Sequence, residues 1–425
     1  MNLSFNNYLK YVPIYLKYHY KIIRKFIKSM SKKELKIFFS LGSVFALRAF
    51  SMFMTLPAIV SYGRNLKGST DFLLGLAIGI YGLTQAIFQI FIGSMLDRFG
   101  KKKLIIFGLF AFVSGSIVSA FSKSIWGLII GRAFQGSGTI SSSMMTTMSD
   151  LIDEKNRIKI MIMIGVNFIF IFLLTIIINP IITYFIGMRG IFFISSIFSI
   201  VSILIAILLI PEKSSMQSKS ENYFSMSSIK KVIKNHRLMK LNFGICFLYI
   251  LLMSNFTVLP SILLNKDSFL IDQNWKLYLV ILFISFVITL PISMVLEKKK
   301  ETKQIFSSCI AIFIISEIMF INFVKNFFLL LISLQIFFIV FGIMENLIST
   351  LINKEYCFEY KGTAIGIYSI FQCGGSAVGG ILGGWFLEIQ GIQSVFILFI
   401  ITSILWFFIN LNSSRLKKIR FLFRN

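Results

Sequence analysis

Ionisable side chains inside long apolar runs are the residues of this chain whose chemistry stands out first. Arg48 and Arg132 lie within such runs in the first half of the chain, and Glu345 lies within one in the second half. A charge near the middle of a bilayer costs at least ~2.5 kcal/mol, so it faces a water-filled cavity or a partner. We therefore expect Arg48 and Glu345 to line a cavity, with a structural ion pair as the alternative. Glu345 is also a candidate for binding and releasing a proton.

Uncharged polar residues accompany these charges. Tyr81, Gln85 and Gln89 recur at every fourth position of one run, so they share one face of a helix. Asn346 stands directly beside Glu345. These four polar residues are candidates for contacts with a small-molecule substrate, and hydrogen bonds between helices are the alternative.

The apolar runs themselves predict the fold. The chain has 425 residues, of which 56% are hydrophobic and 14% are charged. A bilayer core about 30 Å thick takes about 20 apolar residues per helix. A β-barrel is excluded, because its strands alternate apolar and polar residues whereas these runs are apolar throughout. We expect an all-α membrane protein with twelve transmembrane helices, near residues 37–62, 72–96, 104–122, 125–149, 158–181, 188–210, 239–264, 274–296, 304–323, 326–353, 363–388 and 391–411.

The distribution of basic residues predicts the orientation. The net charge is +26, and most of the 43 Lys and Arg residues fall in the two tails and the even-numbered loops. This bias follows the positive-inside rule, which places both termini in the cytoplasm. We interpret the charge as orienting charge at a membrane surface, and nucleic acid is not expected as a partner. The basic N-terminal segment contains Met30, an alternative start.

Cysteine and histidine are too scattered to build a metal site. The four cysteines form no CxxC pair, and the two histidines, His19 and His236, lie in predicted cytoplasmic segments. We expect no disulfide, metal or other cofactor. A membrane-embedded enzyme is disfavoured, because no predicted span holds a histidine and no HxxxxD or HExxH motif occurs. The sequence also lacks a GxxxxGK loop for ATP.

Matching landmarks divide the chain into two halves. "FMTLPAIV" and "SMLDRFGKKK" in the first half have counterparts in "FTVLPSIL" and "SMVLEKKKETK", in the same order and at nearly the same offset. Such matches indicate a two-fold repeat. Two six-helix halves with a substrate site between them form a transporter architecture, whereas channels build symmetric filters from several subunits. We expect a basic N-terminal tail (1–36), two pseudo-symmetric halves (37–210 and 239–411), a cytoplasmic linker (211–238) and a basic tail (412–425).

The segment after the second predicted helix carries a motif of spaced residues, Gly93, Asp97, Arg98, Gly100 and Lys101. It resembles the signature of the loop between helices two and three in the major facilitator superfamily. "GRAFQGSG" is similar to the arginine-containing motif of that family's proton-coupled members. The wider text, including "SVFALRAFSMFMTLP" and "YKGTAIGIYS", resembles a bacterial inner-membrane transporter of the family.

This resemblance implies a secondary transporter whose loop motif acts as a conformational latch. By analogy with the family, Asp97 accepts hydrogen bonds at the start of helix eleven, and Lys101 bridges Asp97 to Asp150. The latch would be made in the outward-open state and broken in the inward-open state. The alternative is a loop whose charge only sets orientation. The resemblance also suggests a role for Arg132 in proton coupling, with hydrogen bonding between helices as the alternative. For Glu317 it suggests a role in helix packing or at the lipid boundary.

Two features depart from the family pattern. Drug/proton antiporters of the family usually carry Gly-Pro and further glycines in helix five, where this chain has Asn179-Pro180 and no following glycine. Close relatives carry a further soluble domain after the last helix, and we expect none here. The sequence predicts a monomeric, proton-coupled exporter of small organic or amphipathic compounds in the bacterial inner membrane. A facilitator, or a symporter that imports a small metabolite, is the alternative.

Overall fold

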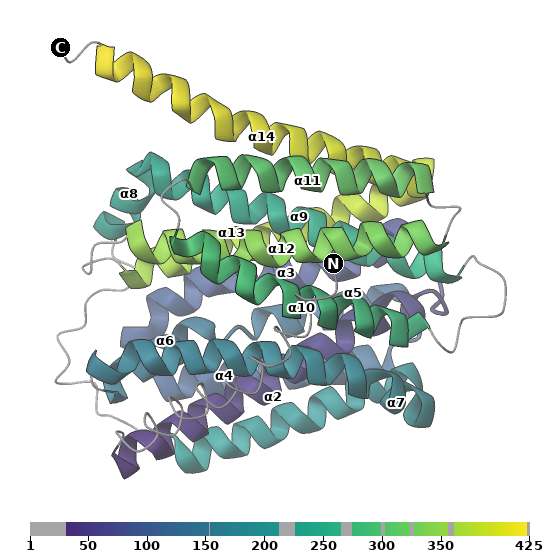
Figure 1. Ribbon diagram of the computed structural model, residues 1–425. Coiled ribbons are helices and arrows are strands. Elements are labelled where there is room, and N and C mark those ends of the chain that lie inside the picture. The colour runs from purple at the N-terminus through teal and green to yellow at the C-terminus, as the bar shows by residue number, and fades with distance from the viewer. Residues whose placement is uncertain are drawn as a thin grey trace, which may run out of the picture.

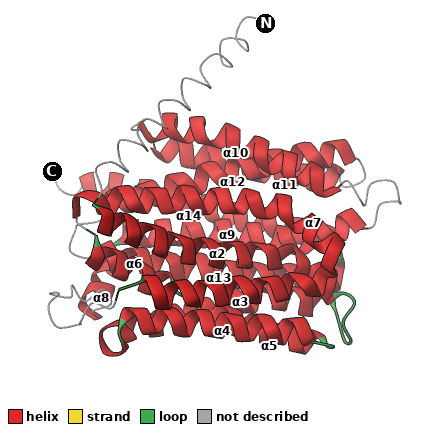
Figure 2. Ribbon diagram, turned by 90° about the horizontal axis from the view of Figure 1, so that it is seen from below, coloured by secondary structure: helices red, strands yellow, loops and turns green. Residues whose placement is uncertain are grey.

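The protein is a bundle of long helices that lie side by side, as the computed structural model shows (Figure 1). The structure describes residues 31–152, 154–211, 226–264, 274–298, 302–323, 327–355 and 361–422. Within these ranges the backbone is almost entirely helical, and short loops join the helices (Figure 2). The helices are α2 (Lys32–Gly63), α3 (Asp71–Phe99), α4 (Lys101–Phe121), α5 (Ile125–Ser137), α6 (Ser141–Leu151), α7 (Glu154–Leu209), α8 (Met226–Lys234), α9 (His236–Leu264), α10 (Asn274–Lys298), α11 (Thr302–Phe323), α12 (Phe327–Glu355), α13 (Lys361–Gln390) and α14 (Ile392–Leu422).

Local sequence explains where several of these helices begin and end. Ser31 and Glu34 form a capping box at the start of α2, in which each side chain binds the other residue's backbone amide. Thr70 caps α3 in a similar way through the amide of Leu73. Gly100 separates α3 from α4 with a φ of 83°, and Gly187 interrupts α7 with a φ of 72°. Glycine adopts positive φ without the steric cost that a side chain would add.

The described residues of the predicted ranges are helical apart from a few end residues, with three differences. The ranges 158–181 and 188–210 both belong to α7, which Gly187 interrupts. The range 125–149 is divided between α5 and α6, and α8 lies within the predicted linker 211–238. Nine of the described helices are long and apolar enough to cross a membrane. The architecture is therefore that of an all-α membrane protein, and the count of twelve spans stays a prediction.

The outer surface of the bundle is strongly apolar. Phe107, Phe110 and Phe121 on α4 are 57%, 62% and 69% exposed. Water-soluble proteins rarely expose contiguous apolar surface of this kind, whereas lipid tails cover it without cost. These aromatic side chains therefore face the bilayer.

The helices pack as two groups. Helices α2 to α7 contact mainly one another, and so do helices α9 to α14. In Figure 1 the first group, purple to teal, lies below the second group, green to yellow. Each group has its own apolar core, and the core of the second group includes the fully buried Phe313. The two groups meet mainly along α3 and α13.

Glycines let α3 and α13 approach each other closely. A side chain added at Gly75 would overlap the backbone at Gly380 and Gly384. One added at Gly79 would place its Cβ 2.6 Å from the carbonyl oxygen of Ala377. Small residues of this kind allow helix backbones to pack directly in membranes. We call this contact the α3–α13 seam.

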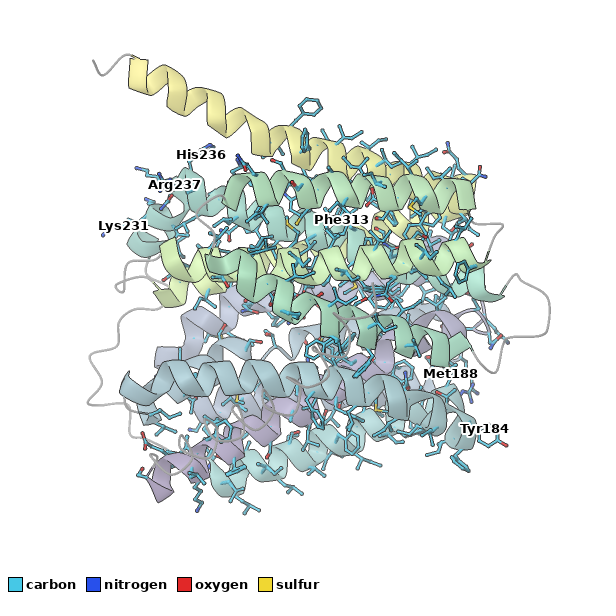
Figure 3. The ribbon with its side chains drawn as sticks, viewed as in Figure 1. Tyr184, Met188, Lys231, His236, Arg237 and Phe313 are labelled. Carbon is cyan, nitrogen blue, oxygen red and sulfur yellow. The ribbon has the colours of Figure 1, made fainter. Side chains whose placement is uncertain are left out.

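The bundle has two distinct ends. One end, which we call the α8 end, carries Lys231, His236 and Arg237, and the opposite end carries Tyr184 and Met188 (Figure 3). The seam glycine Gly75 belongs to the beginning of α3 and Gly384 to the last part of α13. The closest part of the seam therefore lies towards the end opposite α8.

Candidate functional site

Arg48 lies at the centre of a polar cluster in the first helix group. Its Nη2 donates hydrogen bonds to the hydroxyl of Tyr81 (3.2 Å) and to the carbonyl oxygens of Gln135 (3.3 Å) and Gly138 (3.5 Å). Its guanidinium carbon lies 3.7 Å from the centre of the Phe112 ring, a cation–π contact. Arg48 on α2 thus joins α3, α4 and α5, and only 7% of its surface is exposed.

The carbonyl groups that Arg48 binds are those at the end of α5. The sequence predicts one continuous helix over 125–149, but α5 ends at Ser137 and α6 begins at Ser141. Within a membrane, irregular backbone is tolerated only where it is buried in protein or lines a cavity. A cation at the end of a helix is also favoured by the helix dipole. Arg48 therefore stabilises a break that an isolated apolar helix would not form.

Arg132 on α5 is more completely enclosed, with 1% of its surface exposed. Its Nη1 donates to Gln135 Oε1 (2.7 Å) and to Thr55 Oγ1 (3.2 Å), and its Nε donates to the carbonyl oxygen of Ala77 (3.4 Å). Its guanidinium carbon lies 4.4 Å from the centre of the Tyr81 ring. These neutral partners join α2, α3 and α5, which is the geometry of hydrogen bonding between helices.

Neither buried arginine has an acidic partner within the described residues. No described carboxylate oxygen lies within 4 Å of the Arg48 or Arg132 guanidinium, whereas Arg64 and Asp71 do form an ion pair at 3.5 Å. The alternative of a structural ion pair at Arg48 therefore finds no support in the described part of the chain. The described neighbours that stabilise these two positive charges are carbonyl and hydroxyl oxygens, the Gln135 amide oxygen, and the rings of Phe112 and Tyr81.

The predicted stripe on α3 is divided between two environments. Tyr81 and Gln89 are buried, and Gln89 Oε1 accepts a hydrogen bond from Thr139 Oγ1 at 3.4 Å. Gln85 is half-buried. The sequence missed Gln135, which links Arg132 to Ser116 through its amide group (2.8 Å). Its signal was its position three residues after Arg132, on the same helix face.

Glu345 lies in a second polar cluster, in the other helix group. Its Oε1 accepts a hydrogen bond from the hydroxyl of Tyr249 at 2.8 Å, which joins α12 to α9. The neighbouring Asn346 donates from Nδ2 to Ser293 Oγ on α10 at 3.3 Å. Glu345 and Asn346 thus bind two different helices, and neither makes a described hydrogen bond or ion pair with Arg48.

Glu317 has a different setting from Glu345. It is fully buried between α11 and α14, where Ser403 Oγ lies 3.3 Å and 3.2 Å from its two carboxylate oxygens. Both helices lie at the edge of the second group (Figure 1). This arrangement fits the packing role that the resemblance suggests.

Comparison with known proteins decides the family. The family model described as Major Facilitator Superfamily matches residues 41–379 and 274–420. The chain belongs to the major facilitator superfamily. It is 41% identical over 377 residues to the inner membrane transport protein YajR of Escherichia coli, which covers 89% of this chain and 83% of YajR. The predicted resemblance is confirmed, and the chain is a multi-pass inner-membrane transporter and not an enzyme.

Two further comparisons bear on the superfamily fold and its members. A tetracycline resistance protein (class B) of Escherichia coli is 27% identical over 165 residues, which covers 37% of this chain and 40% of that protein. The crystal structure of the nucleoside transporter NupG matches with a TM-score of 0.70 at 15% identity, covering 90% of this chain and 99% of that chain. The likeness to NupG shows a shared fold.

The structure describes only some of the side chains in the superfamily loop motif. Gly93 is buried within α3, Gly100 makes the turn between α3 and α4, and Lys101 is the first residue of α4. The side chains of three predicted latch residues lie outside what the structure describes: Asp97, Arg98 and Asp150. Lys102, the next residue of α4, donates from Nζ to the carbonyl oxygen of Ile207 at 2.8 Å.

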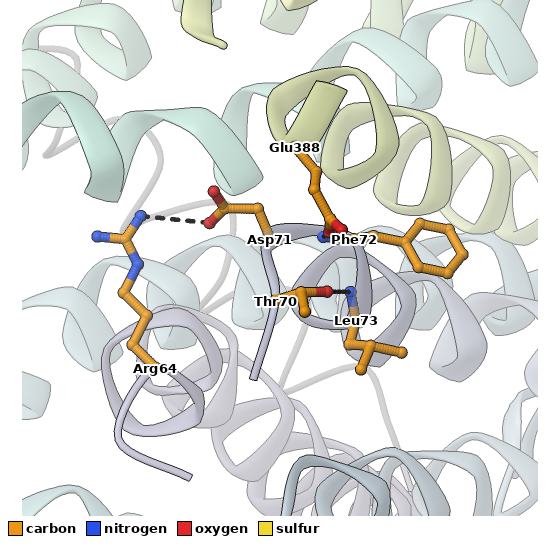
Figure 4. Close-up of polar contacts among 6 residues, drawn as sticks. All are labelled: Arg64, Thr70, Asp71, Phe72, Leu73 and Glu388. Carbon is orange, nitrogen blue, oxygen red and sulfur yellow. Dashed lines mark hydrogen bonds and ion pairs between the residues drawn. The ribbon is translucent and has the colours of Figure 1, made fainter. Parts of the chain in front are cut away.

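A carboxylate at the opposite end of the seam was not predicted. Glu388 on the last turn of α13 accepts a hydrogen bond from the backbone amide of Phe72, with an N–O distance of 2.7 Å (Figure 4). Phe72 is the second residue of α3, where the amides have no partner within the helix and the dipole favours an anion. Glu388 therefore caps α3 across the seam. Its only signal in the sequence was an acid at the end of a predicted helix.

Proposed function

We propose that the protein is a secondary active transporter that exports small organic or amphipathic compounds by alternating access, driven by protons. The observation that carries this proposal is the closed α3–α13 seam. Two helix groups, each with its own polar cluster, meet along glycine contacts, and at one end Glu388 caps the start of α3. A hydrogen bond of this kind can be made and broken without unfolding either group.

The seam suggests two closures that alternate. The Glu388 cap closes the end opposite α8, and the latch of Asp97, Lys101 and Asp150 is its counterpart at the α8 end. Following the positive-inside rule, we place the α8 end and both termini in the cytoplasm. The two helix groups then correspond to the pseudo-symmetric halves 37–210 and 239–411, and one monomer provides both.

Glu345 is the group that we assign to the proton. Its ionised carboxylate can accept the Tyr249 hydroxyl, while its protonated form also becomes a donor. The change in hydrogen bonding involves α12 and α9 together, so protonation is communicated to two helices of the second group. Arg132, held by neutral partners, then contributes to coupling by fixing the shape of the first group.

Export is supported by the relative named for resistance to tetracycline. One observation favours the alternative of symport or facilitated uptake. Asn179, which stands where drug antiporters usually carry glycine, donates from Nδ2 to the carbonyl oxygen of Met54 at 3.2 Å. This bond joins α7 to α2 at a position where drug antiporters usually have glycine, which has no side chain to form it.

Transport in sealed vesicles tests the proposal. Purified protein would be reconstituted into liposomes with an imposed pH gradient and offered anionic, neutral and cationic fluorescent amphipathic dyes. We expect saturable movement of at least one dye that requires the gradient and collapses when an uncoupler is added. Saturable movement that ignores the gradient would favour a facilitator, and non-saturable movement would contradict transport by alternating access.

A further inference from the structure

We propose that Arg48 and the start of α6 form a subsite for one negatively charged oxygen group on the transported compound, such as a carboxylate or a sulfonate. The inference rests on the proposed function, because it names the substrate class of the same site. It is carried by the unused hydrogen-bonding capacity of Arg48 and by the absence of a carboxylate partner among the described residues.

Arg48 retains donors that no described residue uses. All three of its hydrogen bonds leave from Nη2, so Nε and Nη1 donate to no described acceptor. Nε is buried without a partner, which carries a desolvation cost, and Nη1 is not among the fully enclosed unpartnered atoms. Nη1 can therefore donate to one oxygen of a carboxylate or sulfonate without displacing the three partners of Nη2, and a hydrogen bond of this kind between two charged groups is a strong one.

The start of α6 adds further donors close to Arg48. Gly138, whose carbonyl oxygen lies 3.5 Å from Arg48 Nη2, is three residues before Ser141, the first residue of α6. The residue before α6, Ile140, provides no side-chain cap for the first amides of that helix. Ser143 in the first turn is fully buried, and its hydroxyl has no hydrogen-bond partner among the described residues. A helix start with a cation beside it is a favourable environment for an anion.

Arg132 does not provide this subsite, although it is also buried and cationic. Its Nε and Nη1 are engaged by Ala77, Thr55 and Gln135. An anion would have to displace these neutral partners before reaching it. The structure therefore separates a positioning arginine, Arg132, from a binding arginine, Arg48.

The test compares ring compounds that differ only in charge. The thermal stability of the purified protein would be measured without any gradient against benzoate, 1-naphthoate and indole-3-acetate. Each acid would be matched with the alcohol and the amine of the same ring. We expect at least one acid to raise the midpoint of unfolding more than its matched alcohol and amine. Absence of any preference for the acids across the three rings would overturn the proposal without needing a variant.

Variants then test Arg48 itself. Arg48→Gln should weaken the apparent affinity for the preferred acid at least tenfold, and Arg48→Lys should recover part of it. Arg189→Gln, which alters an exposed arginine on α7, should leave the affinity unchanged. An equal affinity in Arg48→Gln and the parent would overturn the assignment. If Arg48→Gln does not fold, Arg48→Lys decides. Weaker binding of the acids alone in Arg48→Lys supports the assignment of Arg48, and parent-like binding of all ligands in that variant overturns it.

The outcomes separate this inference from the proposed function. Binding is measured without a proton gradient, so a facilitator with an anion subsite would pass this test and fail the transport test. A proton-driven transporter of neutral or cationic compounds would pass the transport test and show no preference for acids in the binding test.

Discussion

The two helix groups place opposite charges in their interiors. The first group buries Arg48 and Arg132 with no described carboxylate beside them, whereas in the second group Glu317 is buried and Glu345 is half-buried, each beside a hydroxyl group. A buried guanidinium stays charged, but a buried carboxylate can become neutral by taking a proton. The difference suggests a division of work in which the first group holds a fixed charge and the second carries the charge that can change.

The largest expected effect comes from removing the charge that can change. Glu345→Gln keeps a side chain that can bind the Tyr249 hydroxyl but cannot exchange a proton. We expect near-normal expression and loss of accumulation driven by a pH gradient, measured in reconstituted vesicles. Parent-like accumulation against a gradient in this variant would make Glu345 a structural residue and break the comparison.

A smaller effect is expected at the seam between the groups. Glu388→Gln removes the charge from the exposed hydrogen bond to the start of α3 but keeps a neutral acceptor, which weakens the bond by about 1 kcal/mol, or about fivefold in an equilibrium. The end opposite α8 should then open more often. In a background without native cysteines, Ile381→Cys on α13 should react faster with a membrane-impermeant thiol reagent in the Glu388→Gln protein. An unchanged rate would show that the Glu388 bond does not hold the seam closed.

The opposite shift, by no more than about fivefold, is expected from Asp97→Asn, which replaces a charged acceptor with a neutral one. Weakening the latch at the α8 end should favour closure of the other end and slow the same Ile381→Cys reaction. Lys101→Ala should act in the same direction. Lys103→Ala is the matched control, because Lys103 is exposed whereas Lys102 binds Ile207. Equal rates in all of these variants would reduce the motif to an orienting loop.

The smallest effect is expected within the second group itself. Glu317→Gln keeps a hydrogen-bond acceptor for Ser403 on α14, so stability should change by only about 1 kcal/mol. Accumulation driven by the pH gradient should match that of the parent. Thermal unfolding and vesicle transport measure the two effects separately. A loss of coupling as complete as that expected for Glu345→Gln would place Glu317 in the proton path.

How far the sequence predicts this molecule depends on whether the cause of a feature is local. The helix ranges follow from apolar runs, and the turn at Gly100 and the interruption at Gly187 occur at glycines that the chain itself supplies. The short helix α8 was missed because its polar sequence resembles that of a linker, although Val232 packs against α13 residues.

Features that depend on two distant segments were not predicted. The hydrogen bonds at the break between α5 and α6 come from Arg48, which is 87 and 90 residues away from the carbonyl groups that it binds. The Glu388 bond joins residues 316 positions apart. Arg48, Tyr81 and Glu345 stand out in the sequence because polar residues are costly in an apolar run; the structure buries Arg48 and Tyr81 and leaves Glu345 half-buried, and their roles stay predictions. Their partners were not, because partners are determined by packing.

The break between α5 and α6 has a mechanical consequence. A continuous helix transmits a tilt along its whole length, but α5 and α6 are separate levers that meet at residues 138–140. The α5 lever is fixed against α4, where a side chain at Gly115 would overlap Gly131. Residues 138–140 are therefore the place where the angle between α5 and α6 would change if the two segments moved relative to each other. Arg48 binds the backbone at this joint, so an anion bound by Arg48 would act directly on the connection between α5 and α6.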